Sequence, residues 1–158
     1  MKQFWEVGNF IRGLRSRMRF GELSRAPLRL LRLEIRGDSA ECDWIARPLD
    51  PWDAAMPRGM QEQQSSMQAL RDAIGMREML FLALPQTNTA ELRAYRQSAR
   101  EPPHLIIRGS VTREPPAGNV KRVTSLIMRA KMYGFKFWMD NGILAPLETV
   151  DRRFGFAT

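Results

Sequence analysis

The spacing of apolar residues changes several times along the chain, and this alternation limits the folds that the sequence can adopt. From Leu28 onward apolar side chains occupy alternate positions, as in a strand with one buried face. Between Ser65 and Leu84 they recur at helical spacing, and the strand pattern returns from Thr89. The sequence therefore predicts pairs of strands separated by helices, an order typical of α+β domains.

The first predicted hairpin turns at Gly37-Asp38-Ser39. Its inward side chains are expected to be Leu31, Leu33 and Ile35 on the first strand and Cys42, Trp44 and Ala46 on the second. The stretch that follows, "RPLDPWDAAMPRGMQEQQ", carries three prolines and no steady period, so it is predicted to be a long loop.

The first predicted helix spans Ser65 to Leu84, with Ser65 or Ser66 as its cap and Pro85 beyond its end. Apolar side chains surround most of its circumference, which is typical of a helix buried in a core. Its methionines are also compatible with an adaptable binding groove, although gap-filling in a core is the commoner use.

Arg-Glu-Pro-Pro occurs at both ends of the next predicted strand, at residues 100–103 and 113–116. Proline lacks a backbone donor and disfavours helix at the residue before it, so the two pairs delimit a strand from His104 to Thr112. It is predicted to pair with a strand from Thr89 to Gln97 and to bury Leu105, Ile107 and Val111. Gly109, also on the inward side, is expected to mark a bulge or a close helix crossing. The alternative, a polyproline recognition motif, lacks the Pro-x-x-Pro spacing.

A second helix is predicted from Val120 to Tyr133, capped by Asn119 and stopped by Gly134. A third hairpin follows around Asn141-Gly142, the strongest two-residue turn signal in the chain. The predicted fold is a single α+β domain over residues 23–158, with a largely antiparallel sheet of about six strands in three hairpins (ββαββαββ) and two helices on one face.

Residues 1–22 have the pattern of a basic amphipathic arm that precedes this domain. Apolar residues at helical spacing are flanked by the candidate contact residues Trp5, Arg12, Arg15 and Arg19. Such an arm is compatible with docking on a protein, on nucleic acid or on an anionic membrane surface.

The formal net charge of +8 favours an anionic partner such as nucleic acid. Only four of the 25 basic residues are lysines, however, and an arginine-rich composition can arise without any binding role. One cysteine and one histidine permit neither an internal disulfide nor a zinc site, so we expect no metal, no cofactor and a reducing, cytoplasmic setting. No apolar run is long enough to predict a transmembrane segment.

Catalytic constellations are weak in this sequence. His104 is the only histidine that could act as a base beside a nucleophile, and Cys42 lies on the inward face of its predicted strand. A glycosidase-like carboxylate pair is the remaining option, from the acidic cluster Asp38, Glu41, Asp43, Asp50 and Asp53. An enzyme is therefore disfavoured, and the acidic cluster is kept as a remote alternative.

The better candidates are surfaces. If both helices cover one face of the sheet, the other face is predicted to display Arg32, Arg36, Arg47, Arg93, Tyr95, Arg108, Lys136 and Trp138. Basic groups interleaved with exposed aromatics can follow a phosphate backbone while bases stack on the rings. Glu34, Glu41 and Asp43 are expected on the same face, where they are able to pair with the arginines instead.

Lys121 and Arg122 fall in the first turn of the second predicted helix, where free backbone donors and two cations could hold an anion. Neutralisation by Glu114 or Glu148 is the alternative. Together these features predict a non-enzymatic binding or assembly module that acts through protein contacts, including contacts with a second copy. Nucleic-acid binding through the basic sheet face is the alternative function.

Overall fold

The structure, a computed structural model, describes residues 29–47, 55–97, 101–114 and 120–147. The predicted N-terminal arm with Trp5, Arg12, Arg15 and Arg19 lies outside these residues, as do Asp50, Asp53, Arg100, Asn119 and Glu148. In chain order the elements are β1 (Arg29–Arg36), β2 (Ser39–Ile45), α2 (Arg58–Ala83), β3 (Thr89–Arg96), β4 (His104–Thr112), the 3-10 turn η2 (Val120–Arg122), α3 (Leu126–Tyr133), β5 (Phe135–Asp140) and β6 (Ile143–Ala145).

The predicted α+β class and the three hairpins are confirmed. The strands form one six-stranded sheet in the order β1-β2-β3-β4-β5-β6, and every neighbouring pair except β2 and β3 is antiparallel. The Gly37-Asp38 turn joins Arg36 to Ser39, and the Asn141-Gly142 turn has positive φ angles of 52° and 78°, as a two-residue hairpin turn requires.

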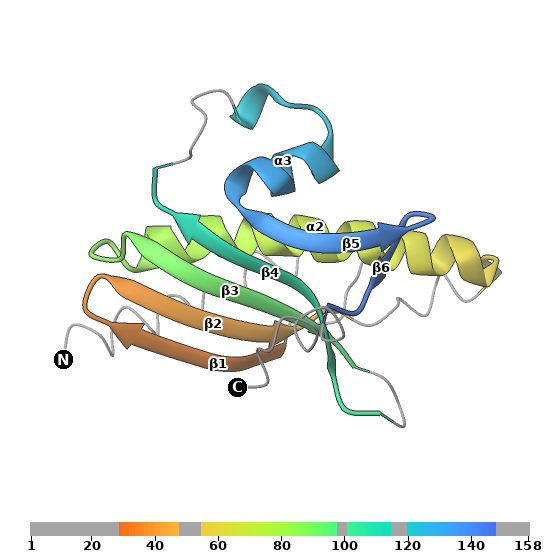
Figure 1. Ribbon diagram of the computed structural model, residues 1–158, viewed down its shortest axis with the longest axis horizontal. Coiled ribbons are helices and arrows are strands. Elements are labelled where there is room, and N and C mark those ends of the chain that lie inside the picture. The colour runs from red at the N-terminus through yellow and green to blue at the C-terminus, as the bar shows by residue number, and fades with distance from the viewer. Residues whose placement is uncertain (1–28, 48–54, 98–100, 115–119, 148–158) are drawn as a thin grey trace.

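Helix α2 runs along one face of the sheet, and α3 packs against α2 and the start of β5 (Figure 1). Parallel strands cannot be joined by a tight turn, and the parallel pairing of β2 with β3 depends on α2 as the crossover. The connection through α3 differs, because β4 and β5 are antiparallel. The two helix connections are therefore topologically distinct, and the fold is not a simple repeat.

Helix α2 begins earlier than its apolar pattern indicated. The sequence predicted a start at Ser65 and a loop before it, whereas the helix begins at Arg58, directly after Pro57 at the cap position. Proline suits a helix start because the first backbone N–H groups have no intrahelical partner. The first turns are polar and partly exposed, so they gave no periodic apolar signal. Ser66 is not a cap; it is buried, and its hydroxyl accepts a 2.9 Å hydrogen bond from the backbone N–H of Leu144.

The second predicted helix is shorter than expected. Residues Val120–Arg122 form a 3-10 turn, and the α-helix begins only after Ser125, whose side chain accepts a hydrogen bond from the N–H of Met128. A serine cap stops the helix from extending toward its N-terminus. The predicted stop at Gly134 is confirmed, with a φ of 106° that disfavours any residue with a side chain.

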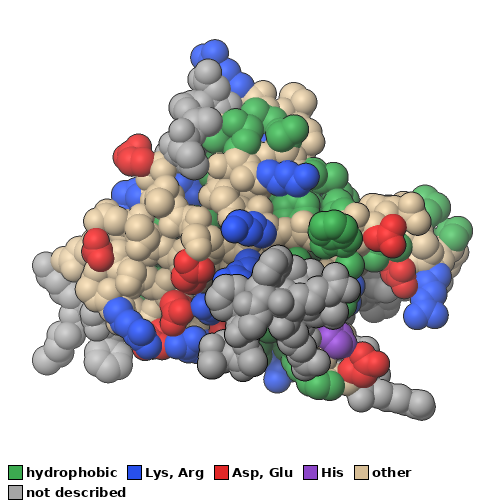
Figure 2. All heavy atoms as spheres, viewed as in Figure 1, with side chains coloured by type: hydrophobic (Ala, Val, Ile, Leu, Met, Phe, Trp, Pro, Cys, Tyr) green, Lys and Arg blue, Asp and Glu red, His purple; other side chains and the backbone are tan. Residues whose placement is uncertain are grey.

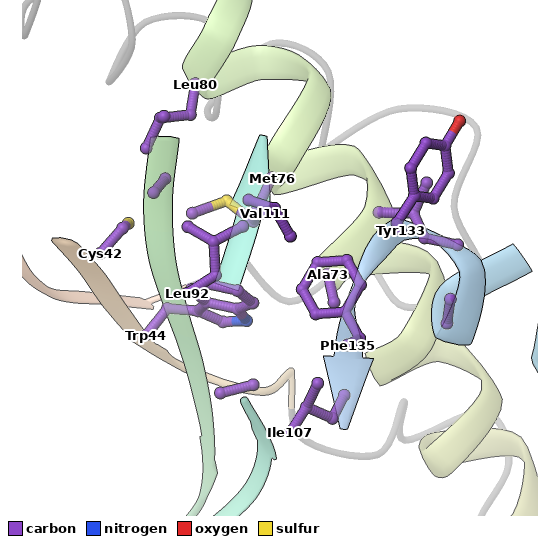
Figure 3. Packing of buried hydrophobic residues seen from close by; sticks show 14 of the residues in the cluster. Cys42, Trp44, Ala73, Met76, Leu80, Leu92, Ile107, Val111, Tyr133 and Phe135 are labelled. Carbon is purple, nitrogen blue, oxygen red and sulfur yellow. The ribbon is translucent and has the colours of Figure 1, made fainter. Parts of the chain in front are cut away.

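The core lies between the sheet and α2, with contributions from α3 and β5 (Figure 3). Cys42 and Trp44 are buried in it as predicted. On β1, Leu33 and Ile35 pack against the core as predicted, but the prediction for Leu31 was wrong: the register shifts between Leu30 and Arg32, so Leu30 lies opposite Trp44 while Leu31 is 46% exposed. A bulge reverses the alternation of side chains, and the sequence pattern alone did not reveal it.

Leu105, Ile107 and Val111 of β4 are buried as predicted. A second register shift, between Ala94 and Tyr95, places Leu105 opposite Tyr95. Ile106, which the alternation did not predict, is also buried and joins the core cluster.

Gly109 on β4 lies opposite Phe135 of β5. A Cβ atom added at this glycine would lie 2.6 Å from Cδ1 of the Phe135 ring. The expected bulge or helix crossing is therefore wrong: the inward-facing glycine makes room for an aromatic side chain of the neighbouring strand.

Arg113, in the second Arg-Glu-Pro-Pro, binds the chain at the end of α2. Its guanidinium donates to the carbonyls of Phe81, Leu84 and Thr87 at 2.7 to 3.0 Å, and it stacks over the Phe81 ring at 5.2 Å. These carbonyls belong to the last turn of the helix and the residues after it, where backbone acceptors lack intrahelical partners. The predicted end of β4 at Thr112 is confirmed. The hydrogen bonds of Arg113 explain why an arginine directly follows the strand.

Substituting Gly109 with alanine is expected to lower the free energy of unfolding by about 1 to 3 kcal/mol, because the added methyl group collides with the Phe135 ring. Urea denaturation measures the change. Gly59→Ala, in open space on α2, is the control and should leave stability unchanged or slightly higher. Equal destabilisation by both substitutions would contradict the packing account.

Arg113→Ala is expected to destabilise the fold by at least about 2 kcal/mol, because three backbone carbonyls lose a charged donor. Arg113→Lys should recover only part of this loss, since one ammonium cannot reach all of the acceptors that the guanidinium spans. Thermal unfolding of both variants beside the exposed control Arg122→Ala tests the prediction. Equal melting temperatures of Arg113→Ala and Arg122→Ala would contradict this account of Arg113.

Candidate functional site

Conventional catalytic groups are not assembled in the described part of the chain. Burial raises the pKa of the Cys42 thiol, which disfavours the reactive thiolate. His104 lies 2.8 Å from Glu101 at the surface. Within residues 29–47, 55–97, 101–114 and 120–147 there is no group of three metal-ligating side chains, and no helix is long and apolar enough to cross a membrane.

The face of the sheet opposite α2 carries most of the side chains predicted for a binding surface. Alternation along the strands places Arg32 and Arg36 of β1, Arg93 of β3, Arg108 of β4, and Lys136 and Trp138 of β5 on this open face. Figure 2 looks onto this side of the molecule and shows basic and acidic side chains intermingled at the lower left and hydrophobic side chains at the upper right.

Arg47 does not belong to the open face. Its side chain is fully buried, and its Nε atom lies 3.0 Å from Oδ2 of Asp72 on α2. Gln68, one turn earlier on the helix, donates to the other oxygen of Asp72 at 2.9 Å. The strand β2 ends at Ile45, so the alternation that predicted an outward Arg47 no longer applies there. Arg47 is part of the interior, and its charge is compensated by Asp72.

Ion pairs cover the part of the open face formed by β1, β2 and β3. Arg32 pairs with Glu34 and Glu41, Arg36 with Glu34, and Arg93 with Glu41 at 3.0 Å and Asp43 at 2.8 Å. We call these six residues, Arg32, Glu34, Arg36, Glu41, Asp43 and Arg93, the ion-pair cluster. It contains as many carboxylates as guanidinium groups and carries no net charge.

The pKa values of the cluster follow from these contacts. A hydrogen bond from Arg93 lowers the pKa of Glu41, and hydrogen bonds from Arg36 and Arg32 lower that of Glu34. Partial burial disfavours the charged guanidinium of Arg93, but hydrogen bonds to Asp43 and Glu41 outweigh this and raise its pKa. Glu41 and Asp43, two of the three described members of the predicted acidic cluster, thus neutralise arginine side chains.

A row of cations crosses from this cluster toward β5. Arg93 lies directly opposite Arg108, and Arg108 lies directly opposite Lys136. Like charges in facing positions on antiparallel strands repel each other and destabilise the pair. The carboxylates of Glu41 and Asp43 neutralise the Arg93 end of the row, whereas Lys136 makes no ion pair with a described acidic residue.

Apolar side chains are exposed on β5, where Lys136 lies, and on α3, which packs against β5. Trp138, two residues further along β5, is 64% exposed, and Met128 on α3 is 52% exposed. Lys131 of α3 lies over the ring of Phe137, with 5.8 Å between its Nζ atom and the ring centroid. Hydrophobic side chains gather over α3 and β5 in Figure 2. We call Arg108, Met128, Lys131, Lys136 and Trp138 the α3/β5 patch.

The sequence predicted Arg108, Lys136 and Trp138 of this patch and missed Met128 and Lys131. The one available signal for an exposed Met128 was its position outside the buried stripe that was expected for the second helix. That signal did not reveal that α3 lies against β5, because only the antiparallel return of the chain after Gly134 brings them together.

Tyr95 occupies a different setting from Trp138. It is only partly exposed, and it lies between Ile45 of β2 and Leu105 of β4, both buried. The hydroxyl end of a tyrosine tolerates such a half-buried position. Tyr95 is therefore a less accessible stacking platform than Trp138.

The anion site predicted at Lys121 and Arg122 required both residues to lie in the first turn of an α-helix, and they do not. Both residues lie in the three-residue 3-10 turn η2 and not in the first turn of an α-helix. The helix N-terminus that was expected to supply aligned backbone donors is at Ser125 instead. Arg122 is exposed, as is Glu114, the described one of its two expected acidic partners.

No family model, no curated protein and no solved structure matches this chain.

Glu41→Gln is expected to lower stability at pH 7 by at most about 1 kcal/mol, because the ion pairs of Glu41 are partly exposed to solvent. The folded-state pKa of Glu41 is below its usual value of 4.5, so this stabilisation is present above that value and is lost as the pH falls through the folded pKa. Urea denaturation at a series of pH values should show the variant and the native protein converging in acid. A difference that persists at low pH would contradict the ion-pair account.

Proposed function

We propose that this protein is a non-enzymatic binding module that contacts a protein partner through the α3/β5 patch. The observation that carries the proposal is the 64% exposure of Trp138 on the same face of β5 as Lys136, together with the 52% exposure of Met128 on α3, a helix that packs against β5. Tryptophan and arginine are enriched among the residues that dominate the energy of protein interfaces. A large aromatic ring left in solvent on a regular strand adds nothing to the core, whereas it can contribute strongly to a contact.

The distribution of charge favours a protein over an extended nucleic acid. A single strand that followed the sheet from β5 toward β1 would meet Glu91, Glu41 and Asp43 on the same face. Nucleic-acid interfaces are more polar and much more positive than protein interfaces. The ion-pair cluster therefore limits the positive surface to a short segment over β4, β5 and α3.

Addition of a partner strand to β1 is a less favourable way to bind. The edge of β1 is interrupted by the register shift between Leu30 and Arg32. The side chains of Arg32, Glu34 and Arg36 are already engaged in ion pairs. Bulges and charged side chains are the usual means by which proteins protect an edge strand from pairing.

The proposal is tested with Trp138→Ser and with Leu82→Ser as the matched control, since Leu82 is 68% exposed on α2, away from the patch. Sedimentation velocity over a range of concentrations detects self-association, and peptides selected on the native protein from an unbiased display library report a heterologous site. We expect Trp138→Ser to weaken the observed contact at least about tenfold, as loss of a dominant aromatic side chain does.

Leu82→Ser should leave the same contact unchanged. If the native protein stays monomeric and the selected peptides bind Trp138→Ser as tightly as the native protein, the α3/β5 patch is not the binding surface.

A further inference from the structure

Three exposed side chains follow one another along the open face of β5: Lys136, Trp138 and Asp140. They share this face because alternate residues of a strand point the same way. The ring of Trp138, 64% exposed, therefore lies between a cation on one side and a carboxylate on the other along the strand. We call these three residues the β5 triplet; the first two also belong to the α3/β5 patch.

The two charges of the β5 triplet cannot pair with each other within one copy of the chain. Four residues of extended strand separate Lys136 from Asp140 by roughly 13 Å, whereas an ion pair needs about 4 Å or less. Neither side chain makes an ion pair with a described residue of opposite charge, in contrast to the arginines of the ion-pair cluster. The triplet therefore presents two separated, opposite charges to a partner.

A second copy of the same strand carries the matching charges in the required order. Consider two copies that meet face to face, related by a two-fold axis that crosses β5 over Trp138. The two β5 strands then run antiparallel, so Lys136 of each copy faces Asp140 of the other. The two Trp138 rings meet at the axis, and aromatic pairs in offset or edge-to-face contact stabilise an interface beyond the area they bury.

The neighbouring strand β6 is compatible with this contact. Trp138 lies opposite Ala145, and Asp140 lies opposite Ile143. Side chains in such facing positions are neighbours on the same face of the sheet, and both β6 residues are partly exposed. They extend the apolar surface around the ring and add no charge that would compete with the two ion pairs.

We propose that this protein forms a two-fold dimer through the β5 triplet, with β5 of one protomer antiparallel to β5 of its partner. This inference rests on the proposed function and identifies the protein partner as a second copy of this chain. A partner with charges of one sign would pair with one end of the triplet and be repelled by the other. The triplet is small beside the surface of about 800 Å² per partner in a stable complex, so we expect a weak dimer.

Exchange of charges within the triplet tests the inference. Lys136→Glu and Asp140→Lys each leave two like charges in the triplet, and the two-fold axis places them opposite each other at both ends. Each single variant should weaken the dimer at least about tenfold, whereas the double variant restores opposite charges and should dimerise within about threefold of the native protein. Sedimentation velocity measures the dimer over about 5 to 500 µM protein, a range suited to a small interface. Salt at about 0.15 M screens the long-range repulsion between two copies of formal net charge +8.

A mixture of the two single variants gives an independent test. An equimolar solution of Lys136→Glu and Asp140→Lys should recover the dimer, because an acidic triplet then meets a basic one. Arg71→Glu and Glu78→Lys make the same changes of net charge at exposed positions of α2 and should leave the dimer unchanged. The urea midpoint of each variant shows whether it is folded.

The outcomes separate the dimer from the proposed function. Failure of both the double variant and the mixture to recover association would overturn the antiparallel dimer, as would a native protein that stays monomeric at the highest concentration. Selected peptides that still require Trp138 would in either case leave the proposed function standing with a different protein partner. If neither self-association nor peptide binding depends on Trp138, both proposals fail.

Discussion

Packing of α2 against the sheet is the interaction on which the rest of the structure depends. The helix makes the parallel pairing of β2 with β3 possible, and its buried face fills the space above Cys42, Trp44 and Leu92. Two further contacts attach β6 and the residue after β4 to this helix and its C-terminal end. The hydroxyl of Ser66 accepts a hydrogen bond from the backbone of β6, and the last turn and the residues after it are bound by Arg113. Without α2 the sheet would keep its hairpins but would have no means to join them in this order.

Arginine is used mainly for structure in the described part of this protein, although the net charge of the sequence favoured an anionic partner. Arg113, Arg77 and Arg96 donate to backbone carbonyls, and Arg47 pairs with a buried aspartate. Burial lowers the pKa of Arg77 and of Arg96, yet guanidinium groups remain charged under ordinary conditions. A planar group with several donors can satisfy carbonyls at the ends of helices and strands, which a lysine does less well.

The remaining charge is divided unevenly across the open face. On β1 and β3, Arg32, Arg36 and Arg93 each have a carboxylate partner, and this region adds little to long-range attraction. On β5, Lys136 makes no ion pair with a described acidic residue and Trp138 is exposed, and α3 adds Met128 and Lys131. At β4, between these two regions, Arg108 faces Arg93 on one side and Lys136 on the other. The surface proposed for a partner is therefore smaller and more apolar than the open face predicted from the sequence.

Local signals in the sequence determined the order of the elements, the turns at Gly37-Asp38 and Asn141-Gly142, the end of α3 at Gly134 and the limits of β4. Each depends on a residue type that restricts its own backbone, so neighbouring residues suffice to predict it. They also placed Arg108, Lys136 and Trp138 on one face.

Tertiary structure decided the features that the alternation of side chains along a strand cannot encode. The register shifts beside Leu31 and Leu105, the burial of Arg47 against Asp72 and the space for Phe135 at Gly109 all depend on residues distant in the chain. The α3/β5 patch exists for the same reason: its residues come together only when the chain reverses after α3 and pairs with β4, because long-range packing, and not local preference, fixes which surfaces meet.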